Sequence, residues 1–248
     1  MELLILILSL YIILFLLSIK LKDNSIVDIF WGIGFIIISI YLFLNNSNIE
    51  IEKIIILILI SIWGLRLSYY IFRRKLKEKK EDPRYELWRK SWKYFYLRSF
   101  FQVFILQMLL MFVISLPIFY IFSGDKLDLN LTILGIFIST IGLILEIVSD
   151  FQVKQFINKY GKINKVFTGG LYKYSRNPNY FGESTFWLGL SIIGASINLL
   201  SFIGFLVITF LLLFVSGVPL KEKRQEKKEN WLDYKSKTNK FIPWFPKN

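Results

Sequence analysis

Long apolar runs separated by short polar segments dominate the hydrophobic pattern of the chain. A run of about 20 apolar residues is long enough to cross a bilayer as a helix. Five runs predict five transmembrane helices: Leu3–Ile19, Ile29–Ile49, Ile54–Phe72, Ser99–Gly124 and Leu129–Ser149. The first lacks the basic flank and small-residue cleavage site of a signal peptide, so it is interpreted as a span.

A sixth apolar run, Ser184–Leu220, is too long for one helix that crosses the membrane. As a single helix it would extend about 55 Å, whereas the hydrocarbon core is about 30 Å thick. Gly194, Asn198 and Ser201 interrupt the run near its middle. This pattern predicts a tight hairpin between a sixth and a seventh helix.

Basic residues are distributed unevenly among the segments that connect these runs. Residues 73–98 hold eleven Lys and Arg against four acids, 150–179 hold six against one, and 220–248 hold nine against four. The segments 45–53 and 123–130 carry one Lys each. Because basic segments stay in the cytoplasm, seven spans place all the rich segments on one side.

The sequence therefore predicts an all-α polytopic membrane protein with seven transmembrane helices, an outer N-terminus and a cytoplasmic C-terminus. Residues 1–248 form one integral membrane domain in this interpretation, in a bacterial inner membrane or the endoplasmic reticulum. Its cytoplasmic parts are a basic loop at 73–98, a polar loop at 150–183, which is the candidate binding segment discussed below, and a tail at 221–248.

Composition narrows the chemistry that is available to the protein. The chain is 54% hydrophobic and contains no cysteine and no histidine. This excludes disulfides and thiolate chemistry, and it removes the usual general base and the commonest metal ligand. The net charge of +13 is interpreted as topology and contact with anionic membrane lipid. We therefore expect neither a metal nor a nucleic acid as a partner.

The most informative polar stretch is Thr168–Glu183, with the sequence TGGLYKYSRNPNYFGE. Its paired glycines predict a turn, and Asn177–Pro178 predicts a helix start with Asn as the cap and Pro in the first turn. Asn179 and Glu183 are four residues apart, so they share one helix face. A carboxylate on a membrane helix usually marks a functional site, although an interfacial loop with anchoring residues gives the same pattern.

Other polar residues lie within or beside the apolar runs. Under the predicted topology most of them are within about two turns of a cytoplasmic helix end, which favours a shared pocket open to the cytoplasm. The alternative is that each is paired structurally or reaches the interface alone. The set comprises Asp28, Arg66, Gln102, Gln107, Glu146, Asp150, Asn179 and Glu183.

The cytoplasmic segments carry groups that suit a large anionic ligand, because phosphate needs fixed positive charge and donors. The candidates are Lys154, Lys159, Lys165, Lys173, Arg176, Lys223, Arg224 and Tyr234. The alternative is that these lysines only satisfy the positive-inside rule. No Rossmann glycine fingerprint follows a strand and no Walker loop is present, so a nucleotide would sit between membrane helices and loops.

These motifs together resemble the steroid 5α-reductase-like membrane proteins, with sterol C14 reductases and isoprenylcysteine carboxyl methyltransferases as more distant members. Similarity is strongest to an uncharacterised branch of DUF1295 type and covers nearly the whole chain. The matching elements are Asp28–Trp31–Gly32, Trp63–Arg66, Asp82–Tyr85, Glu146–Asp150, the RNPNYFGE stretch, Glu222–Arg224 and Tyr234 with Phe241–Pro243.

The resemblance implies seven helices and NADP(H) bound in a cavity that faces the cytoplasm. It implies that Asn179 and Glu183 bind the nicotinamide end, that Asp150 contacts the nucleotide, and that Tyr180 and Tyr234 are further contacts. The implied reaction is hydride delivery to the β-carbon of an enone in a hydrophobic lipid, steroid or isoprenoid substrate, with a proton donor at the carbonyl oxygen.

The steroid enzymes polarise the ketone with a Glu–Tyr pair on their second and third helices, and this pair has no direct counterpart here. Asp28, Tyr69 and Tyr70 are the nearest substitutes and are the catalytic candidates. An aromatic belt is the alternative role of the two tyrosines.

Three functions remain open from the sequence. The first is the NADPH-dependent reductase. The second is an S-adenosylmethionine-dependent membrane methyltransferase, which shares the R-x-P-x-Y-x-G core. The third is a lipid-binding membrane protein without catalysis.

Overall fold

The computed structural model describes residues 1–161 and 163–247, and the elements of this part of the chain are helices with one isolated β-bridge between Ser175 and Asn239. Residues 162 and 248, which fall in the expected 150–183 loop and 221–248 tail, lie outside the described part. The chain divides into two compact units, Met1–Asp125 and Lys126–Asn248. Each unit is described by itself below.

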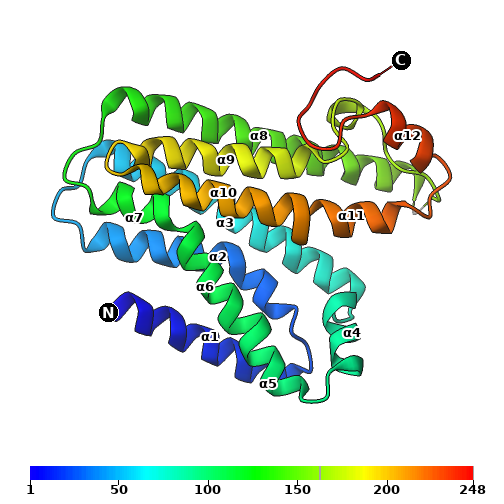
Figure 1. Ribbon diagram of the computed structural model, residues 1–248, viewed down its shortest axis with the longest axis horizontal. Coiled ribbons are helices and arrows are strands. Elements are labelled where there is room, and N and C mark those ends of the chain that lie inside the picture. The colour runs from blue at the N-terminus through cyan, green and yellow to red at the C-terminus, as the bar shows by residue number, and fades with distance from the viewer. Residues whose placement is uncertain (162, 248) are drawn as a thin grey trace. The chain divides into compact units, whose positions relative to one another are not determined.

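The first unit consists of three long helices followed by shorter ones (Figure 1). They are α1 (Glu2–Leu21), α2 (Ile26–Leu44), α3 (Ile51–Glu78), α4 (Pro83–Ser91), α5 (Phe95–Ser99), the π-helical η1 (Phe100–Ile105), α6 (Leu106–Ile114) and α7 (Leu116–Ser123).

The second unit begins with the longest helix and ends with short ones. They are α8 (Leu129–Tyr160), the 3₁₀ turn η2 (Gly170–Lys173), α9 (Pro178–Ala195), the 3₁₀ turn η3 (Leu199–Ser201), α10 (Phe202–Phe210), the π-helical η4 (Leu211–Val215), α11 (Val218–Gln225) and α12 (Trp231–Lys237).

Six helical stretches in the described residues are long and apolar enough to cross a membrane, and the protein is accordingly an integral membrane protein. They are Glu2–Leu21, Ile26–Leu44, Ile51–Glu78, Phe95–Ile114, Leu129–Tyr160 and Leu199–Gln225. The helix α9 is not among them because its first turns carry Asn179, Glu183 and Ser184.

Close backbone contact joins α2 to α3 in the first unit. A Cβ atom on Gly32 would lie 2.3 Å from the Gly64 carbonyl oxygen, and one on Gly64 would lie 2.6 Å from the Gly32 oxygen. Only glycine permits this approach, which is the usual way in which membrane helices pack. Around the contact, Phe35, Ile60 and Trp63 are fully buried.

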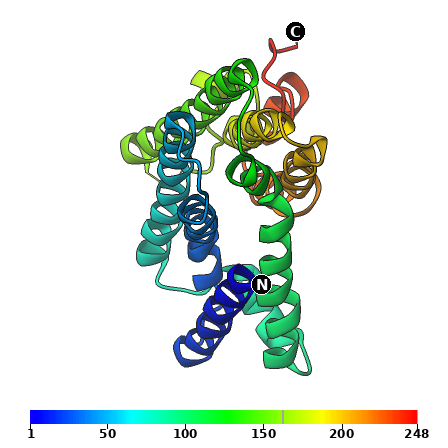
Figure 2. The same cartoon turned by 90° about the vertical axis from the view of Figure 1, so that its left-hand side faces the viewer.

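The same kind of contact joins α8 to α9 in the second unit, where the two helices run side by side with α10 next to α9 (Figures 1 and 2). A Cβ atom on Gly142 would lie 2.4 Å from the Phe186 nitrogen and 2.6 Å from the Gly182 oxygen. Phe186, Trp187 and Leu190 of α9 are fully buried. The helix α9 is thus the core of this unit and positions the residues at its own start.

Helix boundaries follow the predicted runs with two informative differences. Pro117 lies at the beginning of α7, so the expected fourth run ends at Ile114 and continues as a separate short helix. The helix α8 continues to Tyr160, which places Asp150 and Lys154 on a helix within the expected 150–183 loop. The predicted hairpin is confirmed, with a turn at residues 196–198 and reciprocal hydrogen bonds between Ser191 and Ser201.

A large side chain at Gly142 is expected to separate α8 from α9. Gly142→Leu should lower the free energy of unfolding by about 3 kcal/mol, because overpacking here meets backbone atoms that cannot rotate away. Thermal denaturation in detergent measures the change. The control is Ile144→Ala on the exposed side of α8, which should melt close to wild type. Equal melting of the two variants would contradict the proposed contact.

Candidate functional site

The stretch Thr168–Glu183 forms a compact loop that leads into α9. Gly170 has a φ of 55°, so the predicted glycine turn is confirmed at a position that favours glycine. Pro178 is the first residue of α9 and Asn177 precedes it, as predicted. The Asn177 side chain makes a different contact from a cap, because its Nδ2 donates to Glu222 Oε1 at 3.1 Å and to the Lys240 carbonyl at 2.9 Å.

Arg176 ties this loop to the C-terminal helices. Its guanidinium is buried, and Nε donates to Glu222 Oε1 at 2.9 Å. Nη1 donates to the carbonyl oxygens of Thr238 at 2.6 Å and Lys235 at 2.9 Å. A planar guanidinium suits several fixed acceptors at once. These contacts engage Arg176 within the protein, so its main structural effect is to fix the loop.

Lys221 on α11 contacts the start of α9 directly. Its Nζ donates to Asn179 Oδ1 at 3.1 Å and to the Arg176 carbonyl at 3.2 Å. It also lies 4.8 Å from the ring centroid of Tyr172 and 5.5 Å from that of Tyr180, which are cation–π distances.

Asp150 of α8 interacts electrostatically with the Lys221 ammonium. Lys221 therefore interacts with three of the predicted cofactor-binding residues, Asp150, Asn179 and Tyr180. Lys221 itself was not among the predicted residues. Its only signal in the sequence is its position at the end of the last apolar run, directly before the Glu222–Arg224 element.

The other predicted cofactor residues lie in different surroundings. Glu183 is buried one turn after Asn179 on α9, whereas Lys154 and Lys223 are exposed. The Tyr234 hydroxyl donates to the Tyr172 carbonyl at 2.6 Å, and its ring packs with Val166 and Trp231. Burial raises the pKa of Tyr234 above its ordinary value, so this hydroxyl stays protonated at neutral pH.

The C-terminal segment completes the same cluster. The Arg176 backbone N–H donates to the Asn239 carbonyl at 2.8 Å, and Ser175 Oγ donates to the Phe241 carbonyl at 2.7 Å. The Phe241 ring lies 5.6 Å from that of Phe181 on α9. The Phe241–Pro243 element singled out in the sequence therefore packs on the start of α9.

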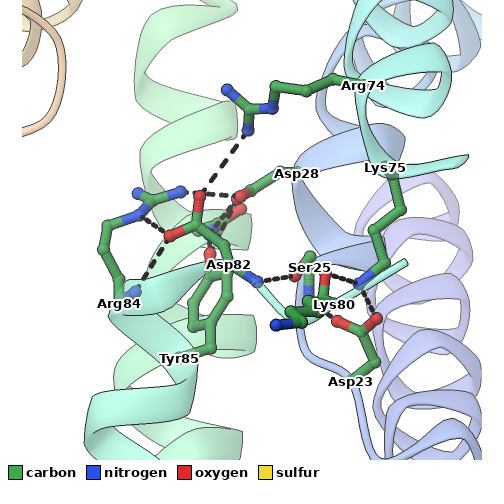
Figure 3. Close-up of polar contacts among 10 residues, drawn as sticks. Asp23, Ser25, Asp28, Arg74, Lys75, Lys80, Asp82, Arg84 and Tyr85 are labelled. Carbon is green, nitrogen blue, oxygen red and sulfur yellow. Dashed lines mark hydrogen bonds and ion pairs between the residues drawn. The ribbon is translucent and has the colours of Figure 1, made fainter. Parts of the chain in front are cut away.

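A second polar cluster surrounds Asp28 in the first unit (Figure 3). Asp28 accepts hydrogen bonds from Arg84 Nη2 at 2.8 Å and from the Tyr85 hydroxyl at 2.7 Å. Gln107 donates to the Tyr85 oxygen at 3.2 Å. Arg84 also donates through Nε to Asp82 at 2.9 Å. These bonds fix the short helix α4 against α2.

Tyr85, which is hydrogen-bonded to the Asp28 carboxylate, is almost completely buried, with 1% of its surface exposed. Burial raises the pKa of the Tyr85 hydroxyl well above its ordinary value, and the neighbouring Asp28 carboxylate raises it further. The pair is therefore a neutral hydroxyl that donates to a carboxylate. A shallow, open depression lies beside it, and its lining residues are Ser25, Asp28, Ile71, Arg74, Lys75, Glu78, Lys80 and Asp82.

The structure does not bring the other two catalytic candidates to Asp28. Tyr69 and Tyr70 are 62% and 46% exposed, and the Arg73 guanidinium lies over the Tyr69 ring at 5.8 Å. Their exposure near the end of α3 matches the aromatic-belt alternative. Sequence reasoning did not assign a role to Tyr85, which lies in the Asp82–Tyr85 element and is the tyrosine that does contact Asp28.

The described residues contain no group of three or more His, Cys, Asp and Glu that could bind a metal ion. Residues 14–240 match the family described as "Protein of unknown function (DUF1295)". The chain therefore belongs to the DUF1295 family, as the motifs indicated. No curated protein and no solved structure matches the chain.

Coupling between Asp28 and Arg84 is expected to be strong because both side chains are largely buried. A double-mutant cycle with Asp28→Asn and Arg84→Met, followed by thermal or denaturant unfolding, should give an interaction energy of about 1–3 kcal/mol. The matched control is the exposed pair Glu86 and Lys90 of the same helix, at 2.6 Å, which should couple by about 0.5 kcal/mol or less. Equal coupling of the two pairs would refute the structural role of Asp28.

Proposed function

We propose that the protein is a seven-helix membrane reductase that uses NADPH to saturate a carbon–carbon double bond in a lipid, steroid or isoprenoid enone. The observation that carries the proposal is the group around Lys221, in which one ammonium, two aromatic rings and the Asn179 amide meet at the start of α9. The likeness of the RNPNYFGE stretch to steroid 5α-reductase-like proteins, carried by the same residues, supports it.

The residues fit an anionic nucleotide in their donor chemistry. Lys221 offers a cation, the start of α9 offers backbone N–H groups, and the half-buried Tyr180 offers a flat surface. Asn177 adds a buried Oδ1 that has no hydrogen-bond partner among the described residues. When bound, NADPH would supply a hydride to the β-carbon of the enone.

The chain's own residues have two kinds of task in this proposal. The cofactor is contacted by Asn179, Tyr180, Glu183 and Lys221, and Asp150 orients the lysine.

Arg176 and Tyr234 act as positioning residues, because both side chains are hydrogen-bonded to backbone carbonyls of the same loop and the C-terminal segment. Lys154 and Lys223, both exposed, reach the phosphates from outside.

The proposal includes a seventh span formed by α9. The helix α9 packs antiparallel along α8, with Gly182 next to Gly142 at one end and Ile193 next to Gly135 at the other. The antiparallel packing on the spanning helix α8 supports a path for α9 back across the membrane. With seven spans, the charge distribution then predicts an outer N-terminus and a cytoplasmic C-terminus.

Accessibility of single cysteines tests the seventh span, because the chain has none of its own. Lys165→Cys and Ser196→Cys flank α9 and should react with an impermeant maleimide from opposite sides of sealed membrane vesicles. Reaction of both from the same side would contradict the span.

Calorimetry of the purified protein in detergent tests the cofactor. We expect NADPH to bind and Asn179→Ala and Lys221→Met each to weaken binding about tenfold, the cost of roughly one lost charge-assisted hydrogen bond. Lys126→Met, at an exposed lysine before α8, is the control and should bind as wild type.

Two results would overturn the reductase proposal. Binding of S-adenosylmethionine in place of NADPH would favour a methyltransferase. Binding of neither cofactor by a protein that is folded by circular dichroism would favour a role without catalysis.

A further inference from the structure

The segment between α3 and α5 has little freedom to leave the membrane surface. The helix α3 ends at Glu78 and the next spanning stretch begins at Phe95. The residues between them, 79–94, include the nine-residue helix α4. Because both ends of this segment enter the bilayer, α4 lies in or near the layer of lipid headgroups.

One side of α4 is fixed to its own unit. Tyr85 and Arg84 bond to Asp28, as described above. Arg89 donates to both carboxylate oxygens of Glu81, at 2.8 Å and 2.9 Å, and its guanidinium lies 4.2 Å from the Phe95 ring centroid. The helix and the turn that follows it are therefore held in one orientation.

The other side of this segment presents apolar and aromatic side chains outward. Leu87 is 63% exposed, and Tyr94 and Tyr96 beyond the helix are 61% and 52% exposed. The indoles of Trp88 and Trp92 are half-buried and stack in parallel with their ring centroids 4.9 Å apart, and Trp88 also contacts the buried Tyr85 ring. Tryptophan and tyrosine with a neighbouring leucine are the residues that favour the membrane interface.

The charges around these aromatic residues are strongly unbalanced. Residues 73–98 hold eleven basic residues and four acids. Three of the acids are paired inside the segment: Glu81 with Arg89, Asp82 with Arg84, and Glu86 with Lys90. Arg73 is exposed and lies over the Tyr69 ring, and the other exposed cations that remain are Lys77, Lys79, Lys80, Lys93 and Arg98.

We propose that the outer side of α4 and its flanks form a binding surface for anionic phospholipid headgroups. We call it the α4 surface, and it consists of Leu87, Trp88, Trp92, Tyr94 and Tyr96 together with Lys77, Lys79, Lys80, Lys93 and Arg98. The aromatic residues sit among the upper acyl chains and the cations bind headgroup phosphates. This role is independent of any reaction that the protein catalyses.

Insertion is tested with a single dye label, which the cysteine-free sequence makes unique. An environment-sensitive fluorophore on Leu87→Cys is compared in nanodiscs of phosphatidylcholine alone and of phosphatidylcholine with phosphatidylglycerol. We expect a blue shift in the anionic discs and quenching by lipids with a nitroxide near the headgroup. A label on Glu229→Cys, an exposed residue before α12, is the control and should not shift.

The charge requirement is tested by melting temperature. The wild-type protein should melt higher in the anionic nanodiscs than in the neutral ones, and replacement of Lys77, Lys79, Lys80 and Lys93 together by Gln should abolish this difference. The matched control replaces Lys154, Lys159, Lys165 and Lys173 by Gln and should keep it.

Either of two results would overturn the proposal. In the first, aqueous iodide quenches the fluorophore at position 87 equally in both kinds of disc. This result would mean that the α4 surface faces water and would favour an acidic soluble protein as its partner. In the second, the two sets of Lys→Gln substitutions lower the difference in melting temperature between anionic and neutral discs by the same amount. The preference for anionic lipid would then depend on the total charge of the protein and not on the α4 surface.

Discussion

A polar group inside a bilayer has no water to bind, so the protein itself has to satisfy it. This constraint accounts for the arrangement within each unit. Middle turns of the long helices are apolar and pack through glycine, whereas the charged and amide side chains gather near helix ends in connected clusters. Each cluster contains an acid and an arginine that would be costly to separate. The clusters therefore fix loops and short helices that apolar packing alone would leave free.

The two clusters use this pairing for different purposes. In the first unit, Asp28 accepts from Arg84 and Tyr85 and docks α4, which leaves a protonated tyrosine beside a carboxylate. In the second unit, Arg176 and Asn177 share Glu222 and fix the loop before α9. This second arrangement places Lys221 against Asn179 and two tyrosine rings, and it is the site on which the proposed binding of a dinucleotide depends.

Much of the helical architecture could be predicted from apolar run lengths, because one bilayer thickness sets the length of every span. The hairpin at 196–198 and the start of α9 at Pro178 followed from local residue chemistry. Pairings between distant segments could not be predicted. Neither run length nor periodicity indicates that Tyr85, and not Tyr69 or Tyr70, meets Asp28, or that Lys221 meets Asn179. Such pairings depend on tertiary packing, and π-turns such as η4 change the helix register shortly before Lys221.

The most direct test of the central claim is hydrogen–deuterium exchange of the full-length protein in detergent with and without saturating NADPH. If the start of α9 and the Lys221 ammonium bind the dinucleotide, peptides that cover residues 168–183 and 218–225 should exchange more slowly with NADPH, while peptides of α1 are unchanged. Unchanged exchange in both of these regions at saturating NADPH would contradict the claim.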